Sequence, residues 1–423
     1  QAMATQLEVI HSDQAIALEG EPLQPGEQRL LSQPIQLQIG TGVVLRLSPG
    51  GGDTLPALLR QRQQREQELQ QRRKQLGVAS SDAAEQLERQ RRSLEAELSN
   101  LRQAARAIPW SGLEERLAQL QPRRQRLEAA LELNPTGPQA WALALALLQQ
   151  PPEASLRTLA DQRRQALVGD AVTYVVNRNL NLSNHCVKHC SFCAFRRDPG
   201  QEGAYWHSLD TLQQRASEAH TLGATELCLQ GGLNPEARLD GSALAYHARL
   251  LEALAAAAPG LHLHAFSPQE LLFIAEQDQL PLQAVIDGLL EAGLGSVPGT
   301  AAEVLSERVR QRLCPEKLSA REWCAVILEV HAAGLASTAT LMAGHLEAPA
   351  DRAAHLLTLV ALQQYAWQHR RSGFSEFVLL PFIGAAAPAA LRERVGRDQP
   401  DRTAMLALTA QARLLLGRWV VNH

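Results

Sequence analysis

Residues 184–195 read NHCVKHCSFCAF and hold three of the six cysteines in this 423-residue chain. Cys186, Cys190 and Cys193 stand in the spacing C-x3-C-x2-C, and no fourth cysteine follows nearby. Close thiols among aromatic and basic residues tend to be reactive or to bind metal, so three purely structural cysteines are the least favoured interpretation. The stretch therefore predicts a centre with three thiolate ligands.

Two kinds of metal centre fit three thiolates. A zinc ion would need His185, His189 or Cys228 as its fourth ligand, but zinc sites usually combine two separated ligand pairs. A [4Fe–4S] cluster held by three cysteines keeps one iron open, and that iron can chelate the amino and carboxylate groups of S-adenosylmethionine. We favour the cluster, because it explains the missing fourth cysteine. Phe192 would then lie against the adenine, with ordinary core packing as the alternative.

The sequence around the cysteines alternates β-prone runs with helical stretches. The alternation follows a linker signal at NPTGP (134–138) and predicts a parallel α/β barrel over 134–423, with its core at about 168–400. The cysteines then follow the first barrel strand. The expected strands are 172–182, 225–230, 261–266, 294–299, 337–344 and 376–381.

Two further segments precede the barrel. Residues 1–54 contain short β-prone runs, separated by EPLQPGEQ and ended by a glycine-rich turn at PGGGDT. Residues 55–133 predict a helical coiled coil that turns near LGVASSD or IPWSG and is broken at Pro109. This segment weakly resembles the middle region of coiled-coil ATPases of chromosome segregation. Its heptad positions are Leu87, Leu94, Leu101 and Ile108, and a second pattern follows at Leu113, Leu117, Leu120 and Leu127.

The composition of the chain indicates which partners and which cellular compartment to expect. A net charge of −3 gives no reason to expect nucleic acid or an anionic membrane. The basic run RQRQQRE at 60–66 is better explained as a solvated helix face. No stretch reaches the roughly 18–20 apolar residues of a membrane span, and no secretory signal is visible. With few, clustered cysteines, we expect a cytoplasmic protein.

The stretch LQGGLNP (229–235) ends the second expected barrel strand. Gly231 and Gly232 there would let the backbone approach a ligand closely. The carboxyl ends of barrel strands carry active sites, so these glycines are candidates for contact with the methionine part of S-adenosylmethionine.

Seven motifs together carry a resemblance to a known family. In order they are TYVVNRNLNLSNHCVKHCSFCAFRRD, ELCLQGGLNP, HLHAFSPQE, GLGSVPGTAAEVL, CPEKLSAREW, TATLMAGHLE and SEFVLLPFIG. Over about residues 140–423 the chain resembles the radical S-adenosylmethionine enzymes of the FO synthase subunit 2 family. The resemblance leaves residues 1–133 outside. It also implies that relatives continue a short way beyond His423, so the barrel is expected to be incomplete at its C-terminus.

The resemblance implies a reaction. A 5′-deoxyadenosyl radical abstracts hydrogen from L-tyrosine, the Cα–Cβ bond breaks with release of 2-iminoacetate, and the 4-hydroxybenzyl fragment joins 5-amino-6-(D-ribitylamino)uracil. FO synthase subunit 1 then closes the deazaflavin ring. Two alternatives stay open: a radical enzyme of the futalosine route to menaquinone, and a non-catalytic fusion remnant.

The same motifs supply candidate site residues. Cys186, Cys190 and Cys193 match the cluster ligands, and Gly231 with Gly232 match the methionine patch.

For the other candidate site residues, a structural role is an alternative to contact with a ligand. Glu303 is a candidate contact to the cosubstrate, with helix capping as the alternative. Thr340 and His345 are candidates for contact with tyrosine or the uracil, although a buried, satisfied histidine explains His345 equally well. In HLHAF we expect only one of His262 and His264 to face the interior, and we choose His264.

Overall fold

The computed structural model describes residues 5–31, 33–48, 54–106, 110–300, 302–420 and 422. The chain divides into two compact units, residues 1–107 and 108–423, and each is described by itself. The predicted turn at 49–53 and the predicted helix break at Pro109 lie outside the described residues. Among the described helices, none is long and apolar enough to cross a membrane.

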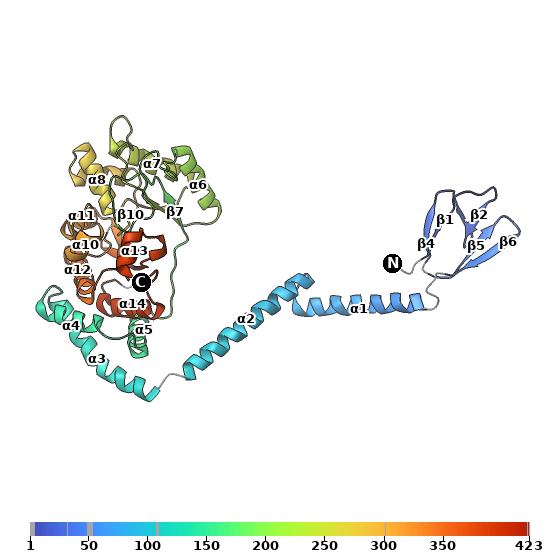
Figure 1. Ribbon diagram of the computed structural model, residues 1–423, viewed down its shortest axis with the longest axis horizontal. Coiled ribbons are helices and arrows are strands. Elements are labelled where there is room, and N and C mark those ends of the chain that lie inside the picture. Colours follow the sequence, from blue (N-terminus) through green and yellow to red (C-terminus); the bar gives the residue numbers. More distant parts are fainter. Residues whose placement is uncertain are drawn as a thin grey trace. The chain divides into compact units, whose positions relative to one another are not determined.

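The first unit begins with short antiparallel strands (Figure 1). Strands β1 and β4 form one pair, and the order β3-β2-β5-β6 forms a second sheet. The stretch EPLQPGEQ, predicted as a break, instead contains β3 and leads into β4, because only its Gln24–Glu27 portion turns. The strands are β1 (Thr5–Glu8), β2 (Ile16–Leu18), β3 (Glu21–Leu23), β4 (Gln28–Leu31), β5 (Ile35–Ile39) and β6 (Val43–Leu47).

Two long helices follow, α1 (Thr54–Leu76) and α2 (Ser81–Arg106). The chain turns between them at the predicted LGVASSD, where Gly77 adopts a φ of +65° that suits glycine. The heptad leucines of α2 are 51% exposed at Leu87, 64% at Leu94 and 60% at Leu101. A heptad seam is buried only by a second helix along its length, and the described part of this unit does not cover it.

In the described residues of the second unit, six strands form one parallel sheet, in the order of the chain. Strands β7 and β12 form the two edges of this sheet, so the described strands make an open half-barrel. This architecture confirms the predicted α/β class. All six expected strands are present. The first begins later than predicted. The strands are β7 (Asn177–Asn181), β8 (Glu226–Gln230), β9 (His262–Ala265), β10 (Ser296–Val297), β11 (Ala336–Ala343) and β12 (Phe374–Pro381).

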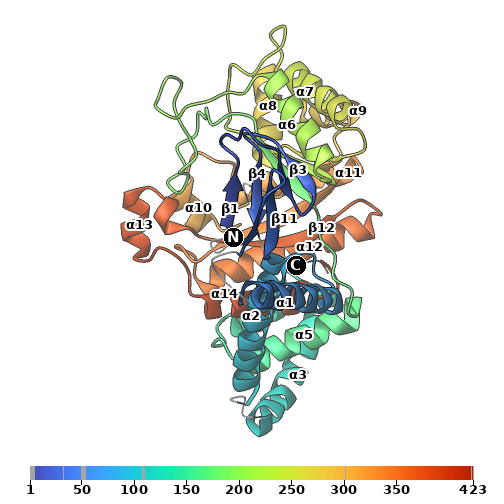
Figure 2. The same cartoon turned by 90° about the vertical axis from the view of Figure 1, so that its right-hand side faces the viewer.

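Helices between the strands cover one face of this sheet, and Figure 2 shows α6 to α9 grouped together. In β8, Leu227 and Leu229 are fully buried in the core beneath these helices. Side chains alternate along a strand, so Glu226, Cys228 and Gln230 face the concave side. The covering helices are α6 (Leu209–Thr221), α7 (Ala243–Ala257), α8 (Pro268–Asp278), α9 (Leu282–Glu291), α10 (Glu307–Leu313), α11 (Ala320–Ala332) and α12 (Pro349–Gln368).

The second leucine pattern belongs to this unit. Helix α3 (Trp110–Leu133) buries Leu113, Leu120 and Leu127, and it packs with α4 and α5 (Figure 1). The compact unit therefore begins at residue 108, whereas the sequence suggested a boundary at 133. The remaining elements are α4 (Pro138–Leu148), α5 (Ala154–Val168), the short 3₁₀ turn η1 (Gly384–Ala386), α13 (Ala389–Val395) and α14 (Arg402–Leu416).

Candidate active site

The three cysteines lie together at the carboxyl end of β7. Cys186, Cys190 and Cys193 line one cavity of about 460 Å³. Within the loop, the Cys193 amide donates to the Cys190 carbonyl at 3.1 Å. Burial raises the pKa of the Cys190 thiol to about 12, against the opposing effect of the Lys317 ammonium. Such a thiol becomes a thiolate ligand only when a cation replaces its proton.

Gly232 anchors the cysteine loop to the end of β8. Its amide donates to the Ser183 carbonyl at 2.7 Å, and the Val187 amide donates to the Leu233 carbonyl at 3.1 Å. A Cβ on residue 232 would lie 2.1 Å from the His185 carbonyl oxygen and 2.9 Å from the Cys186 Cβ. Only glycine permits this approach, so the second glycine of the GG pair shapes the loop that carries the ligands.

The segment after α10 holds the loop from the other side. The Ser191 amide and hydroxyl both donate to the Leu313 carbonyl, at 3.0 and 2.7 Å. The His189 amide donates to Glu316 at 2.9 Å, and the His189 ring contacts the same carboxylate. Leu313 at the end of α10 and Glu316 of the motif CPEKL therefore both hold the cysteine loop.

A buried ion pair lies in the cavity wall. Lys317 Nζ is 2.7 Å from Glu303 Oε1 and 5.3 Å from the centre of the Phe192 ring. Glu303 thus pairs with lysine, and α10 begins only at Glu307, so the capping alternative does not describe its contact. All three side chains line the same cavity as the cysteines.

Glu270 connects Gly231 to the start of helix α8. Its side chain accepts from the Gly231 amide at 3.0 Å and from both the amide and hydroxyl of Ser267, in a capping box that starts α8. Burial raises the pKa of this carboxyl. The Gly231 amide therefore has a protein partner, although Gly231 still lines the cavity.

Two candidates lie away from the cavity wall. The Thr340 hydroxyl donates to the Gly299 carbonyl at 2.9 Å and so fixes the loop after β10. The buried His345 ring contacts the Met342 carbonyl and the Leu346 amide, and it lies beside Glu347. Both buried side chains have hydrogen-bond partners within the protein, Thr340 in the loop after β10 and His345 in the bend after β11, as buried polar groups usually do.

The expectation for HLHAF needs a correction. His262 and His264 are two residues apart in one strand, so both side chains leave the same face. Their rings both contact the Ser296 hydroxyl at 2.6 Å. Burial lowers the pKa of His264 to about 4. Neither histidine is among the residues that line the cysteine cavity.

The polar cavity residues that sequence reasoning missed include Lys317, Gln269 and Glu270. The S-x-x-E pattern in FSPQE signals a capping box, but it does not reveal that Glu270 also reaches Gly231. Gln269 Oε1 accepts from the Leu318 amide at 2.8 Å. These contacts join segments far apart in the chain, so local patterns carry no sign of them.

The donor set fits a three-cysteine cluster with a cosubstrate beside it. Three sulfur ligands share one cavity, and the hydroxyl oxygen of Thr300 in its wall is buried without a hydrogen-bond partner. Residues 180–359 match the family model of the radical SAM superfamily. The solved structures of methylornithine synthase and of a maturase of the [FeFe]-hydrogenase share the fold.

The structure of methylornithine synthase matches with a TM-score of 0.50 at 14% sequence identity, and the match covers 66% of this chain and 73% of the synthase chain. The structure of the [FeFe]-hydrogenase maturase matches with a TM-score of 0.51 at 14% sequence identity, and the match covers 74% of this chain and 65% of the maturase chain. The chain is a radical S-adenosylmethionine enzyme, and the cofactors of that class are a [4Fe–4S] cluster and S-adenosylmethionine.

Relatives with curated names identify the family within the class of radical S-adenosylmethionine enzymes. A protein of Cyanothece sp. is 52% identical over 281 residues, covering 66% of this chain and 74% of the relative. A protein of Gloeobacter violaceus is 50% identical over 297 residues, covering 70% and 72%. Both carry the name 5-amino-6-(D-ribitylamino)uracil–L-tyrosine 4-hydroxyphenyl transferase. The chain belongs to this family of transferases.

Proposed function

We propose that this chain joins the 4-hydroxybenzyl group of L-tyrosine to 5-amino-6-(D-ribitylamino)uracil. The observation that carries the proposal is the cavity that brings the three cysteines together with Gly231, Gly232 and the Lys317–Glu303 pair. Family membership at about half identity supplies the substrates, which are those in the relatives' name.

Each part of the cavity has a separate task in this proposal. The three thiolates would hold the cluster, and the contacts of Gly232 fix the loop that carries them. When bound, the cluster and S-adenosylmethionine supply the radical that starts the reaction on tyrosine. Phe192 would lie against the adenine, and the carboxylate of Glu303, held by Lys317, would accept from hydroxyls of the cosubstrate.

The polar residues that do not line the cavity have a supporting role. Thr340 holds the loop that precedes Glu303, through its bond to Gly299. His345 holds the bend after β11. We therefore propose that both position the cavity wall and leave contact with tyrosine and the uracil to other residues.

An anaerobic turnover assay tests the proposal. Cluster-loaded protein would receive S-adenosylmethionine, a reductant, L-tyrosine and the diaminouracil, with 5′-deoxyadenosine and the hydroxybenzyl adduct followed by mass spectrometry. We expect both products. Deoxyadenosine without adduct would contradict the substrates while keeping the radical site. Neither product, with the cluster intact, would contradict the catalytic function.

The proposal extends to a partner and a compartment. A second radical enzyme, FO synthase subunit 1, would convert the adduct to the deazaflavin FO. A cluster with an open iron is exposed to oxidation, and this suits the reducing cytoplasm. Formation of FO only when both proteins are mixed would support the sequence of steps.

A further inference from the structure

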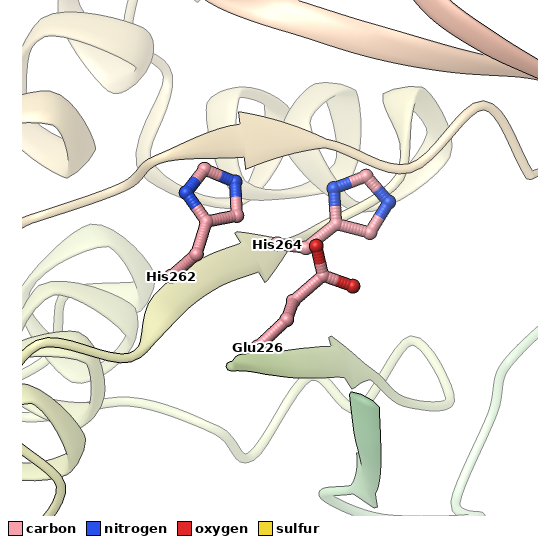
Figure 3. Close-up of side chains that lie close together, drawn as sticks. All are labelled: Glu226, His262 and His264. Atoms are coloured by element: carbon pink, nitrogen blue, oxygen red, sulfur yellow. The ribbon is translucent and has the colours of Figure 1, made fainter. Parts of the chain in front are cut away.

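A second cluster of metal-type ligands lies on the concave face of the half-barrel. It consists of Glu226 at the start of β8 and of His262 and His264 on β9 (Figure 3). One ligand atom from each of the three side chains lies within 4.8 Å of the other two. None of the three residues lines the cysteine cavity.

Parallel pairing brings the three side chains together. Glu226 is the register partner of His262, and Cys228 is the partner of His264. Because positions two apart share a face, all three side chains project from adjacent strands to the same side. Figure 3 shows the two imidazoles side by side, with the Glu226 carboxylate beside His264. Sites on strands hold their ligands more precisely than sites on loops.

Neighbouring residues orient each ligand. Ser296 Oγ lies 2.6 Å from His262 Nε2 and 2.6 Å from His264 Nδ1. Asn177 Nδ2 donates to Glu226 Oε1 at 3.0 Å. Gly295 leaves space for the His262 ring, since a Cβ there would lie 2.5 Å from its Cε1. Such outer contacts are what fix ligating side chains in metal sites.

The donor set selects a class of ion. Two imidazoles and one carboxylate are ligands of zinc and of ferrous iron, with further positions left for water or another ligand. Bonds of about 2.0–2.1 Å place tetrahedral ligands roughly 3.4 Å apart. The ligand atoms therefore need only a side-chain adjustment on strands that stay in place. His262 is exposed, which gives an ion a path from solvent.

We propose that Glu226, His262 and His264 bind one divalent transition-metal cation, separate from the cysteine-bound cluster. The Ser296 hydroxyl, 2.6 Å from one ring nitrogen of each histidine, would hold the two rings in place beside the ion. The ion's remaining positions would face the barrel interior.

A manganese titration tests this site without competition from the cysteines. The cluster-loaded protein would be titrated anaerobically with Mn²⁺ while the spectrum of free Mn²⁺ is followed by electron paramagnetic resonance. Zn²⁺ would then be added to displace it, since nitrogen ligands favour zinc over manganese. The variants are Glu226→Gln and His262→Gln, which keep size and polarity. His220→Gln, an exposed histidine at the end of α6, is the control.

We expect one Mn²⁺ per chain, displaced by Zn²⁺, with affinity weakened at least about tenfold in both variants and unchanged in the control. Cluster absorbance and circular dichroism would establish that each variant is folded. Absence of saturable binding by Mn²⁺ and Zn²⁺ would overturn the proposal. So would unchanged metal affinity in both variants, or weaker binding of tyrosine or the uracil with metal binding intact. The last result would identify the three side chains as a substrate wall.

Discussion

Lys317 Nζ lies 2.7 Å from Glu303 Oε1, and the two side chains are only 16% and 12% exposed. Burial acts to lower the pKa of Lys317, but the charge and hydrogen bond of Glu303 together with the nearby Cys190 and Cys314 outweigh burial, so the pKa of Lys317 is raised above its usual value. Lys317 therefore keeps its positive charge at neutral pH. It lies in the wall shared by the three cysteines.

Replacing Lys317 with methionine should destabilise the protein strongly. The substitution leaves the Glu303 carboxylate buried without its counter-charge, which costs on the order of 3 kcal/mol. Urea unfolding monitored by circular dichroism measures the change. The double variant Lys317→Met/Glu303→Gln, which removes both charges, should recover much of the loss. Equal stability of the single variant and the native protein would contradict this account.

Gly232→Ala should disrupt cluster binding, because the new Cβ would meet the His185 carbonyl oxygen at 2.1 Å. The cysteine loop must then shift, at a cost of about 1–3 kcal/mol. Gly231→Ala is the matched control, since its Cβ would have its nearest neighbour at 3.4 Å. Iron content and visible absorbance after reconstitution give the readout. Equal iron content in the two variants would refute the steric argument.

Cys190→Ser should abolish both the cluster and turnover, because two thiolates remain where three are needed. Cys324→Ser, which changes a free thiol packed at the edge of the core, should keep the absorbance and the activity. Full cluster absorbance in Cys190→Ser would eliminate this residue as a ligand.

Stability should fall as the pH is lowered from 6.5. Burial, with a smaller effect of Arg310, lowers the pKa of His355 to about 3. Unfolded histidine titrates near 6.5. Between these values the unfolded chain binds a proton that the native chain does not, so the stabilisation present above pH 6.5 is lost on acidification, by up to about 1.4 kcal/mol per pH unit.

His355→Asn tests that dependence. In the native protein, His355 Nδ1 accepts a hydrogen bond from the Leu305 amide at 3.0 Å. An asparagine side-chain oxygen can accept the same hydrogen bond, but asparagine does not titrate. Urea unfolding at pH 7, 6 and 5 should therefore show a pH slope reduced by about one proton. His220→Asn, at an exposed site, should keep the native slope. An unchanged slope in His355→Asn would mean that this histidine is not neutral in the native state.

Local patterns predicted all six described strands of the half-barrel, and side-chain caps mark where two of its helices begin. Helix α6 begins after Ser208, whose side chain caps it, and α8 begins with the capping box of Ser267 and Glu270. The first unit was predicted less well, because EPLQPGEQ combines turn residues with the short strand β3. The leucines of α3 resembled a continuation of the coiled coil, yet α4 and α5 bury them.

The sequence alone determined the three-thiolate spacing, the alternation of strands and helices, and the family. All three depend on residues close in the chain or on ordered motifs. Only the tertiary structure decided which polar groups meet. It paired Lys317 with Glu303, and it set His262 and His264 on one face beside Glu226. It also turned the side chains of Thr340 and His345 toward backbone carbonyls. Such contacts depend on strand register and loop packing, which bring together residues that no short stretch of sequence relates.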